Sequence, residues 1–160
     1  MINKNSIYIL CGLLFLFVVI FDQATKFSIL AFIPNGTSVS ICEYINLVVV
    51  YNYGTSFGLL HPSNMLQHYM MIGLTIGCVT FLSYTFFKLH NLIEKVLCSI
   101  LIGGAVGNLI DRFIHGAVVD FIDIYYNHWH FPAFNFADAC ISCSVICFLL
   151  KSFFSKNNTY

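Results

Sequence analysis

The chain reads Asp138-Ala139-Cys140-Ile141-Ser142-Cys143-Ser144-Val145-Ile146-Cys147-Phe148-Leu149-Leu150-Lys151 near its C-terminal end. The twelve residues between the two charged ones are uncharged and mostly apolar. As a helix they cover only about 18 Å, whereas the hydrocarbon core of a bilayer is roughly 30 Å thick. A helix that crosses here must carry Asp138 or Lys151 into the bilayer, and only a Lys side chain is long enough to reach back to the interface. Because a carboxylate at membrane depth is costly, the stretch indicates a membrane-spanning helix with a functional acid at Asp138.

Composition places the whole chain in the same class of protein. It has 160 residues, of which 59% are hydrophobic and only 9% are charged, and its mean hydropathy is +0.83. Soluble domains carry roughly 25% charged residues, so this composition indicates an integral membrane protein. The formal net charge of zero argues against nucleic-acid binding, which requires a basic surface.

The apolar segments predict a polytopic α-helical protein with four membrane spans in one domain, residues 1–160. The spans are expected at about 6–21, 66–87, 92–110 and 136–154. With both termini cytoplasmic, only Lys26 and Arg112 lie outside among the seven basic residues. The other five lie inside: Lys4, Lys88, Lys95, Lys151 and Lys156. This bias satisfies the positive-inside rule and orients the spans.

Acidic residues show the opposite bias. Only Glu94 falls on the cytoplasmic side in this topology, and the other six acids fall outside: Asp22, Glu43, Asp111, Asp120, Asp123 and Asp138. Carboxylates hardly influence membrane insertion, so insertion does not explain the bias. It indicates that the chemistry lies at the extracytoplasmic face.

Two segments lie outside the membrane in this topology. Residues 27–65 contain the turn signal Pro34-Asn35-Gly36 and then the run Tyr44-Ile45-Asn46-Leu47-Val48-Val49-Val50-Tyr51, which is rich in β-branched and aromatic residues. We expect this segment to form a small β-rich lobe on the outer membrane surface. Residues 113–135 carry aromatic side chains that suit the interfacial belt.

The third span ends in Gly103-Gly104-Ala105-Val106-Gly107-Asn108-Leu109-Ile110-Asp111-Arg112. Its glycines predict close helix packing through a face of small residues. Asn108, Asp111 and Arg112 are three or four residues apart, so they share a helix face and can hydrogen-bond to one another. We expect Arg112 to pair with Asp111, which keeps that Asp ionised and makes it a structural brace.

Asp120 and Asp138 have surroundings that favour opposite protonation states. Apolar neighbours flank Asp120, and such surroundings raise a carboxyl pKa by desolvation. Asp138 follows Asn135, which can cap the fourth span, and a helix N-terminus favours the ionised form. An acid beside a carboxylate is the arrangement of an aspartic-peptidase dyad, in which one group activates water and the other donates a proton. The alternative for Asp120 is an interfacial acid that points into water, and we expect Asp123 to be of that kind.

Other chemistries have weaker support. Ser56 lacks a suitably spaced His and acid, and Lys26 more simply neutralises Asp22 four residues earlier on the same helix face. His128 and His130, like the three cysteines of the fourth span, fit the membrane interface and helix packing better than metal binding. We therefore expect no metal site.

Five sequence blocks follow one another over about residues 7–150. They are Asp22-Gln23-x-x-Lys26, Asn52-x-Gly54-x-Ser56-Phe57, Gly103-Gly104-Ala105-x-Gly107-Asn108-Leu109-Ile110-Asp111-Arg112, Val118-Val119-Asp120-Phe121 and Phe131-Pro132-x-Phe134-Asn135-x-Ala137-Asp138. In this order they resemble the blocks of the bacterial lipoprotein signal peptidases, also called signal peptidase II. Thr55 and Phe136 depart slightly from the family pattern, and neither touches the chemistry.

The resemblance implies an intramembrane aspartic endopeptidase of the bacterial cytoplasmic (inner) membrane, with its active site near the periplasmic face. Such an enzyme removes the signal peptide of a prolipoprotein just before a Cys that carries a diacylglyceryl group. By the matching blocks, the catalytic pair is Asp120 and Asp138. Asp111 is an alternative partner for Asp138, and we choose Asp120 because Arg112 lies beside Asp111. The positions implied to bind substrate or support the site are Asp22, Lys26, Asn52, Gly54, Asn108, Asp111, Arg112 and Asn135.

The resemblance also implies a curved extracytoplasmic β-sheet and a short periplasmic helix that hold a substrate whose lipid stays in the bilayer. Expected partners are membrane lipids, diacylglyceryl-modified prolipoproteins and cyclic peptide inhibitors of the globomycin type, with no nucleic acid. We expect a monomer. No metal or organic cofactor is expected, since the dyad activates water itself.

A proton-coupled small membrane transporter is the alternative function, because it also places acids at membrane depth. A transporter is expected to carry acids along a transmembrane path and often to show internal repeats. Here the acids cluster at one face and the sequence shows no repeat. A non-catalytic scaffold explains the glycines and aromatics but not the paired acids.

The basic-residue bias makes a testable prediction about topology. Alkaline phosphatase fused after Tyr160 should be inactive in cells, whereas a cytoplasmic reporter at the same position should be active, because the C-terminus lies inside. Alkaline phosphatase activity from this fusion would overturn the four-span topology.

Overall fold

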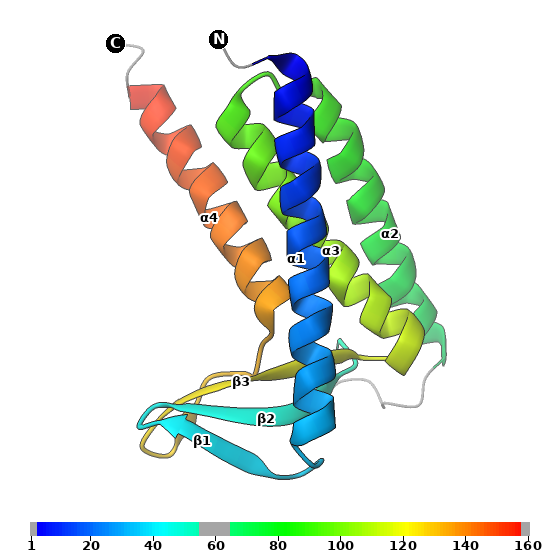
Figure 1. Cartoon of the computed structure of the whole chain (residues 1–160), viewed down its shortest axis with the longest axis vertical. Coiled ribbons are helices and arrows are strands. Elements are labelled where there is room, and N and C mark those ends of the chain that lie inside the picture. The colour runs from blue at the N-terminus through cyan, green and yellow to red at the C-terminus, as the bar shows by residue number, and fades with distance from the viewer. Residues whose placement is uncertain (1–2, 55–64, 158–160) are drawn as a thin grey trace.

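The structure is a computed structural model that describes residues 3–54 and 65–157. Its helices are α1 (Lys4–Phe32), α2 (Met65–Lys88), α3 (Leu92–His115) and α4 (Phe136–Asn157). Each of these four helices is long and apolar enough to cross a membrane. Both termini lie at one end of the helical bundle, and a small sheet lies at the other end (Figure 1). The predicted four-helix membrane fold is therefore confirmed.

Helix α3 is the centre of the bundle. It packs against α1, α2 and α4. A Cβ atom at Gly103 would lie 3.0 Å from Cβ of Val18 in α1, and one at Gly104 would lie 2.8 Å from the carbonyl oxygen of Ala137 in α4. The distance at Gly104 is too short for a larger residue and the distance at Gly103 is tight, so these glycines let the helices approach closely, as the sequence predicts.

Apolar side chains cover the outside of the helices. Ile20 is 64% exposed, Phe81 67% and Leu149 65%. Polar side chains are instead buried where the helices meet the sheet, and they include Asp22, Lys26, Asn108, Asp111, Asp120 and Asn135. This distribution suits a protein that is surrounded by lipid and keeps its polar groups inside.

The sheet is antiparallel, with the strand order β1-β2-β3-β4. Its strands are β1 (Ser38–Cys42), β2 (Ile45–Asn52), β3 (Val118–Tyr126) and β4 (Trp129–His130). The first two strands form the β-rich lobe that the sequence predicts. Pairing of β2 with β3 places Val50 opposite Asp120 and Asn52 opposite Val118. The end of β2 therefore lies beside the start of β3.

Strand β3 starts soon after α3, because Gly116 ends that helix. Gly116 is the C-cap of α3 and has a φ of 73°, in the left-handed region that glycine adopts without steric cost. The chain turns between His115 and Val118. This short turn keeps the last two turns of α3 next to the first residues of β3.

The structure corrects two expected boundaries. The first span, predicted at 6–21, is helix α1 (Lys4–Phe32), so residues 27–32 belong to this helix and not to the outer lobe. Asp22 and Lys26 do not end the helix, because both find buried partners along its side. Residues 113–135 form the end of α3 and the strands β3 and β4. The described residues contain no separate short periplasmic helix, and residues 55–64 lie outside them.

Close packing at Gly104 makes a prediction about stability. Gly104→Ala should lower the free energy of unfolding by about 1–3 kcal/mol, because its Cβ atom meets the Ala137 carbonyl oxygen and pushes α4 away from α3. Thermal unfolding in detergent measures this loss. Gly77→Ala in α2 is the matched control, since no atom lies within 4 Å of a Cβ atom there. Equal stability of the two variants would contradict this account of the packing.

Candidate active site

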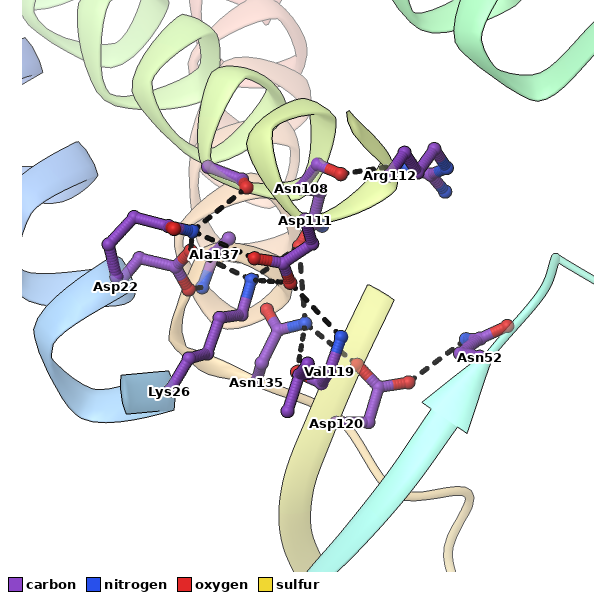
Figure 2. A network of polar contacts seen from close by, with 12 residues as sticks. Asp22, Lys26, Asn52, Asn108, Asp111, Arg112, Val119, Asp120, Asn135 and Ala137 are labelled. Carbon is purple, nitrogen blue, oxygen red and sulfur yellow. Dashed lines mark hydrogen bonds and ion pairs between the residues drawn. The ribbon is translucent and has the colours of Figure 1, made fainter. Parts of the chain in front are cut away.

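A buried ion triad of Asp22, Lys26 and Asp111 lies where α1 meets α3. Lys26 Nζ is 2.8 Å from Asp22 Oδ2 and 2.7 Å from Asp111 Oδ2. The three side chains are at most 3% exposed. The predicted pairing of Lys26 with Asp22 is confirmed, and the structure adds Asp111 as a second carboxylate on the same ammonium group (Figure 2).

Two backbone N–H groups complete the ion triad. The N–H of Ala137, in the first turn of α4, donates to Asp22 Oδ1 at 3.0 Å. The N–H of Val119, on β3, donates to Asp111 Oδ2 at 3.0 Å. The ion triad therefore connects four elements, α1, α3, β3 and α4. Backbone donors of this kind have no residue-type signature, so sequence reasoning did not find them.

Gln23 is a further member of this network that sequence reasoning missed. Its Nε2 donates to Asp111 Oδ1 at 2.9 Å and to the Gly107 carbonyl oxygen at 3.1 Å. The only sequence signal for Gln23 was its place in the block Asp22-Gln23-x-x-Lys26. Its amide fixes the orientation of the Asp111 carboxylate from the side of α1.

Arg112 does not form the predicted ion pair with Asp111. In residues 3–54 and 65–157, the cation within ion-pair distance of Asp111 is Lys26, and Arg112 Nη1 donates to the Asn108 carbonyl oxygen at 3.1 Å. Adjacent helical residues point about 100° apart, so Asp111 and Arg112 face different neighbours. Figure 2 shows the Arg112 side chain pointing away from the ion triad. Asp111 is a structural brace, as expected, but Lys26 neutralises it.

Asp120 lies on β3 and is 1% exposed. Its Oδ2 accepts a hydrogen bond from Asn52 Nδ2 at 2.9 Å, and its Oδ1 accepts one from Asn135 Nδ2 at 2.7 Å. Burial, together with the negative charge of Asp138, raises the pKa of Asp120 to about 6, although the Asn52 hydrogen bond opposes the shift. The desolvation that the sequence predicts for Asp120 is confirmed.

Asp138 lies in the first turn of α4 and forms a reciprocal cap with Asn135. Asn135 Oδ1 accepts a hydrogen bond from the Asp138 N–H at 2.9 Å, and Asp138 Oδ2 accepts one from the Asn135 N–H at 3.3 Å. The carboxylate accepts a second hydrogen bond at Oδ1, from Asn108 Nδ2 at 2.7 Å. The predicted cap is confirmed, and both carboxylate oxygens face hydrogen-bond donors.

Asn135 and Asn108 join the two carboxyl groups into one cluster. Asn135 contacts Asp120 through its amide nitrogen and Asp138 through the cap, and its Nδ2 also donates to Asn108 Oδ1 at 3.2 Å. The sequence placed Asp120 and Asp138 at the same membrane face but gave no contact between them. The structure supplies this connection through two asparagines.

Gly54 supports this cluster through Asn52. The Gly54 N–H donates to Asn52 Oδ1 at 2.8 Å, which leaves Asn52 Nδ2 facing Asp120. Gly54 has a φ of 83°, and a Cβ atom there would collide with the Met71 side chain. The positive φ therefore favours glycine here, and the terminal methyl group of Met71 would have to move to admit a side chain.

Asp123 lies outside this cluster, and its expected role as a solvated acid is wrong. It is 8% exposed, because β2 and β4 cover it. His130 Nδ1 lies 2.8 Å from Asp123 Oδ1, and Asn46 Nδ2 donates to its Oδ2 at 3.2 Å. Ser56 falls outside the described residues. Across the described parts of the chain, no group of three or more His, Cys, Asp or Glu side chains could hold a metal ion.

Comparison with known proteins gives consistent matches over most of the chain. The family model described as signal peptidase (SPase) II matches residues 14–154. The lipoprotein signal peptidase of Tolumonas auensis is 39% identical over 143 residues, which cover 88% of this chain and 87% of that protein. The lipoprotein signal peptidase of Burkholderia cenocepacia is 36% identical over 132 residues, which cover 82% and 80%.

Solved structures give the same result. A bacterial membrane enzyme determined by the in meso method at 2.3 Å resolution is 34% identical and superposes with a TM-score of 0.82 over 94% of this chain and 91% of that one. A second such enzyme, at 1.9 Å resolution, is 36% identical and has a TM-score of 0.79, with 88% and 90% of the chains covered.

Proposed function

This chain belongs to the signal peptidase II family of aspartic proteases and removes signal peptides from prolipoproteins, and we propose that Asp120 and Asp138 are its catalytic pair. It is a multi-pass membrane protein, in agreement with its four apolar helices and with the membrane enzymes that share its fold. The peptidase function predicted from the sequence is confirmed, and the transporter alternative is set aside.

The contrast between the two acids is the observation that supports the catalytic pair. Asp120 is buried on β3, and its pKa of about 6 is high for a carboxyl group, so it holds a proton more readily than an ordinary Asp. Asp138 lies at a helix N-terminus, and donors face both of its oxygens. Two carboxyl groups with such different surroundings divide naturally into an acid and a base.

In the proposed mechanism, ionised Asp138 removes a proton from a water molecule as the water oxygen attacks the scissile carbonyl carbon. Protonated Asp120 gives its proton to the carbonyl oxygen, so a neutral tetrahedral intermediate forms. When the C–N bond breaks, the proton on Asp138 passes to the leaving amine, and the intermediate returns a proton to Asp120 as the new carboxyl group forms. Each acid thus ends the cycle in its starting state.

Arg112 and the asparagines support this mechanism through charge and position. Among the nearby carboxylates, Asp138 interacts most strongly with the guanidinium charge of Arg112. The amide groups of Asn52, Asn108 and Asn135 hold the two carboxyl groups in place.

We extend the proposal to the location of the site. The polar cluster is built from β3, the first turn of α4 and the end of α3. These segments lie at the end of the bundle that carries the sheet, opposite both termini (Figure 1). With five of seven basic residues assigned to the side of the termini, this end faces the periplasm and the termini lie in the cytoplasm. The proposed enzyme acts at the periplasmic face of the bacterial inner membrane.

Substrate and partners follow from the same proposal. The proposed substrates are prolipoproteins whose Cys carries a diacylglyceryl group that stays in the bilayer while the peptide reaches the dyad. The family relationship supports inhibition by cyclic peptides of the globomycin type. We propose that the enzyme works as a monomer in contact with membrane lipids, without a cofactor.

Substitution of the two acids tests the mechanism. Asp120→Asn and Asp138→Asn should each fold but cleave a diacylglyceryl-modified precursor at least about 100-fold more slowly, because an amide can neither activate water nor transfer its proton. The double variant should be scarcely slower than either single variant, since the two acids act as one unit. Cleavage by purified variants in detergent, with thermal unfolding as a check of folding, measures both effects.

Asp111→Asn is the matched control, because Asp111 belongs to the ion triad and not to the proposed pair. It should retain more activity than either dyad variant. Rapid turnover by Asp120→Asn beside a folded but inactive Asp111→Asn would transfer the role to Asp111. Turnover by Asp138→Asn would end the aspartic mechanism.

The hydrogen bond from Asn52 to Asp120 makes a prediction about pH. The Asn52 amide lowers the pKa of Asp120, so Asn52→Leu should raise this pKa above its present value of about 6. Asp120 must be protonated to act as the acid, so kcat/KM falls as the pH rises through the pKa of Asp120. The alkaline limb of the pH profile should therefore move to higher pH in Asn52→Leu. A limb that stays in place or moves to lower pH would contradict the assignment of Asp120 as the acid.

A further inference from the structure

Three asparagine side chains present their NH2 groups to the two acids. Asn52 and Asn135 donate to Asp120 at 2.9 Å and 2.7 Å, and Asn108 donates to Asp138 at 2.7 Å. An amide rotated by 180° presents its oxygen instead, and that oxygen would repel an ionised carboxylate. Each amide therefore needs a group behind it that fixes its orientation.

Backbone N–H groups fix two of the three amides. The Gly54 N–H donates to Asn52 Oδ1 at 2.8 Å, and the Asp138 N–H donates to Asn135 Oδ1 at 2.9 Å. A backbone N–H can only donate, so the oxygen of each amide must face it and the nitrogen must face Asp120.

Lys26 is the corresponding group for Asn108. Its Nζ donates to Asn108 Oδ1 at 3.0 Å, which turns Asn108 Nδ2 toward Asp138. An ammonium group has three hydrogens and no acceptor, and here its acceptors are Asp22, Asp111 and Asn108. The two carboxylates therefore hold Lys26 in place, and Lys26 in turn holds the Asn108 oxygen.

Asn135 is a weaker constraint on Asn108. Its Nδ2 also faces Asn108 Oδ1, at 3.2 Å, but it faces the Val119 carbonyl oxygen at 3.3 Å and Asp120 Oδ1 at 2.7 Å as well. An amide nitrogen has two hydrogens for these three acceptors, and the shortest contact is to Asp120. Lys26 has one hydrogen for each of its three acceptors, so no other contact competes with its hydrogen bond to Asn108.

We propose that Lys26 is a positioning residue, whose ammonium group locks the Asn108 amide so that the general base Asp138 always meets an N–H donor. This role rests on the proposed catalytic pair. Lys26 does not touch the reacting atoms in this role, and it acts on the reaction only through Asn108. The ion triad is therefore connected to catalysis as well as to folding.

The single change Lys26→Met leaves two buried carboxylates without their cation, and such a protein can fail to fold. The test is instead Asp22→Asn with Lys26→Met, which removes one charge of each sign and keeps an oxygen for the Ala137 N–H. Its reference is Asp22→Asn alone, which keeps Lys26. The charged groups around Asn108 and Asp138 are Asp22, Lys26, Asp111, Arg112 and Asp120. Their summed charge is lower by one unit in the double variant than in the reference, so a third variant is needed to separate charge from orientation.

Asn108→Leu is that third variant, because it keeps Lys26 and the summed charge but removes the N–H donor to Asp138. Relative to their references, both the double variant and Asn108→Leu should lower kcat by about 10- to 100-fold, the range for a lost hydrogen bond to a charged group. In both variants the acidic limb of the pH profile of kcat/KM should move to higher pH, because the ionised base has lost a donor.

Lys95→Met is the matched control for losing a buried Lys. Lys95 is 7% exposed, and its Nζ donates to the Phe86 carbonyl oxygen in the other half of the bundle. This variant can lose stability, but its pH profile should not move, since a loss of folded enzyme lowers the rate equally at every pH.

An unmoved acidic limb in Asn108→Leu, or in the double variant relative to Asp22→Asn, would refute the positioning role while the peptidase proposal stands. If the double variant does not fold, Asn108→Leu alone decides whether the donor to Asp138 matters. Lys26→Arg then tests whether a cation at this position orients Asn108. An acidic limb at the wild-type pH supports the positioning role, and a displaced limb in a folded protein opposes it. Failure of the wild-type chain to cleave a lipidated precursor would overturn the proposed function and this role together.

Discussion

The ion triad around the buried Lys26 ammonium group is the interaction on which the rest of the structure depends. The ammonium group lies between a carboxylate of its own helix and one of α3, and those carboxylates also accept N–H groups of α4 and β3. Desolvating three charges costs free energy that their attraction only partly returns, so such a triad contributes less to net stability than to specificity. Its value lies in the arrangement that it favours, in which four elements dock so that each charge of the ion triad has a partner.

Small residues make this arrangement accessible. At Gly107 a Cβ atom would lie 2.5 Å from Asp22 Oδ2, so a side chain on this face of α3 would separate the ion triad. Gly116 then returns the chain along the end of α3, and Val119 reaches Asp111. The glycines set the distance between the helices and the charges set their register. The sheet completes the same construction, since β2 brings Asn52 to the buried acid of β3.

Sequence reasoning succeeded where the decisive interactions are local or follow from hydropathy. Four apolar runs predicted the helices. A spacing of four residues predicted the Asp22–Lys26 pair, and a spacing of three residues predicted the cap of Asp138 by Asn135. It failed where partners come from distant segments. Asp111 was assigned to its neighbour Arg112 because nothing in the sequence reveals that α1 brings Lys26 to it. Asp123 was assigned to solvent because its cover depends on strand register, which a β-bulge shifts between Leu47 and Val50. The family resemblance identified Asn52 and Gly54 as site residues but did not predict their contacts.

The position of Lys26 one helical turn after Asp22 has a consequence for the biogenesis of the protein. Helix α1 is synthesised and enters the membrane before α3 exists, and at that time neither Asp111 nor Asn108 is present to meet the ammonium group. Because the two charges neutralise each other within a single helix, α1 crosses the translocation machinery as an ion pair rather than as two isolated charges. Asp111 then enters on α3 as a single acid, and its cation, Lys26, is already present on α1. The order of the segments along the chain is thus also a workable order of assembly.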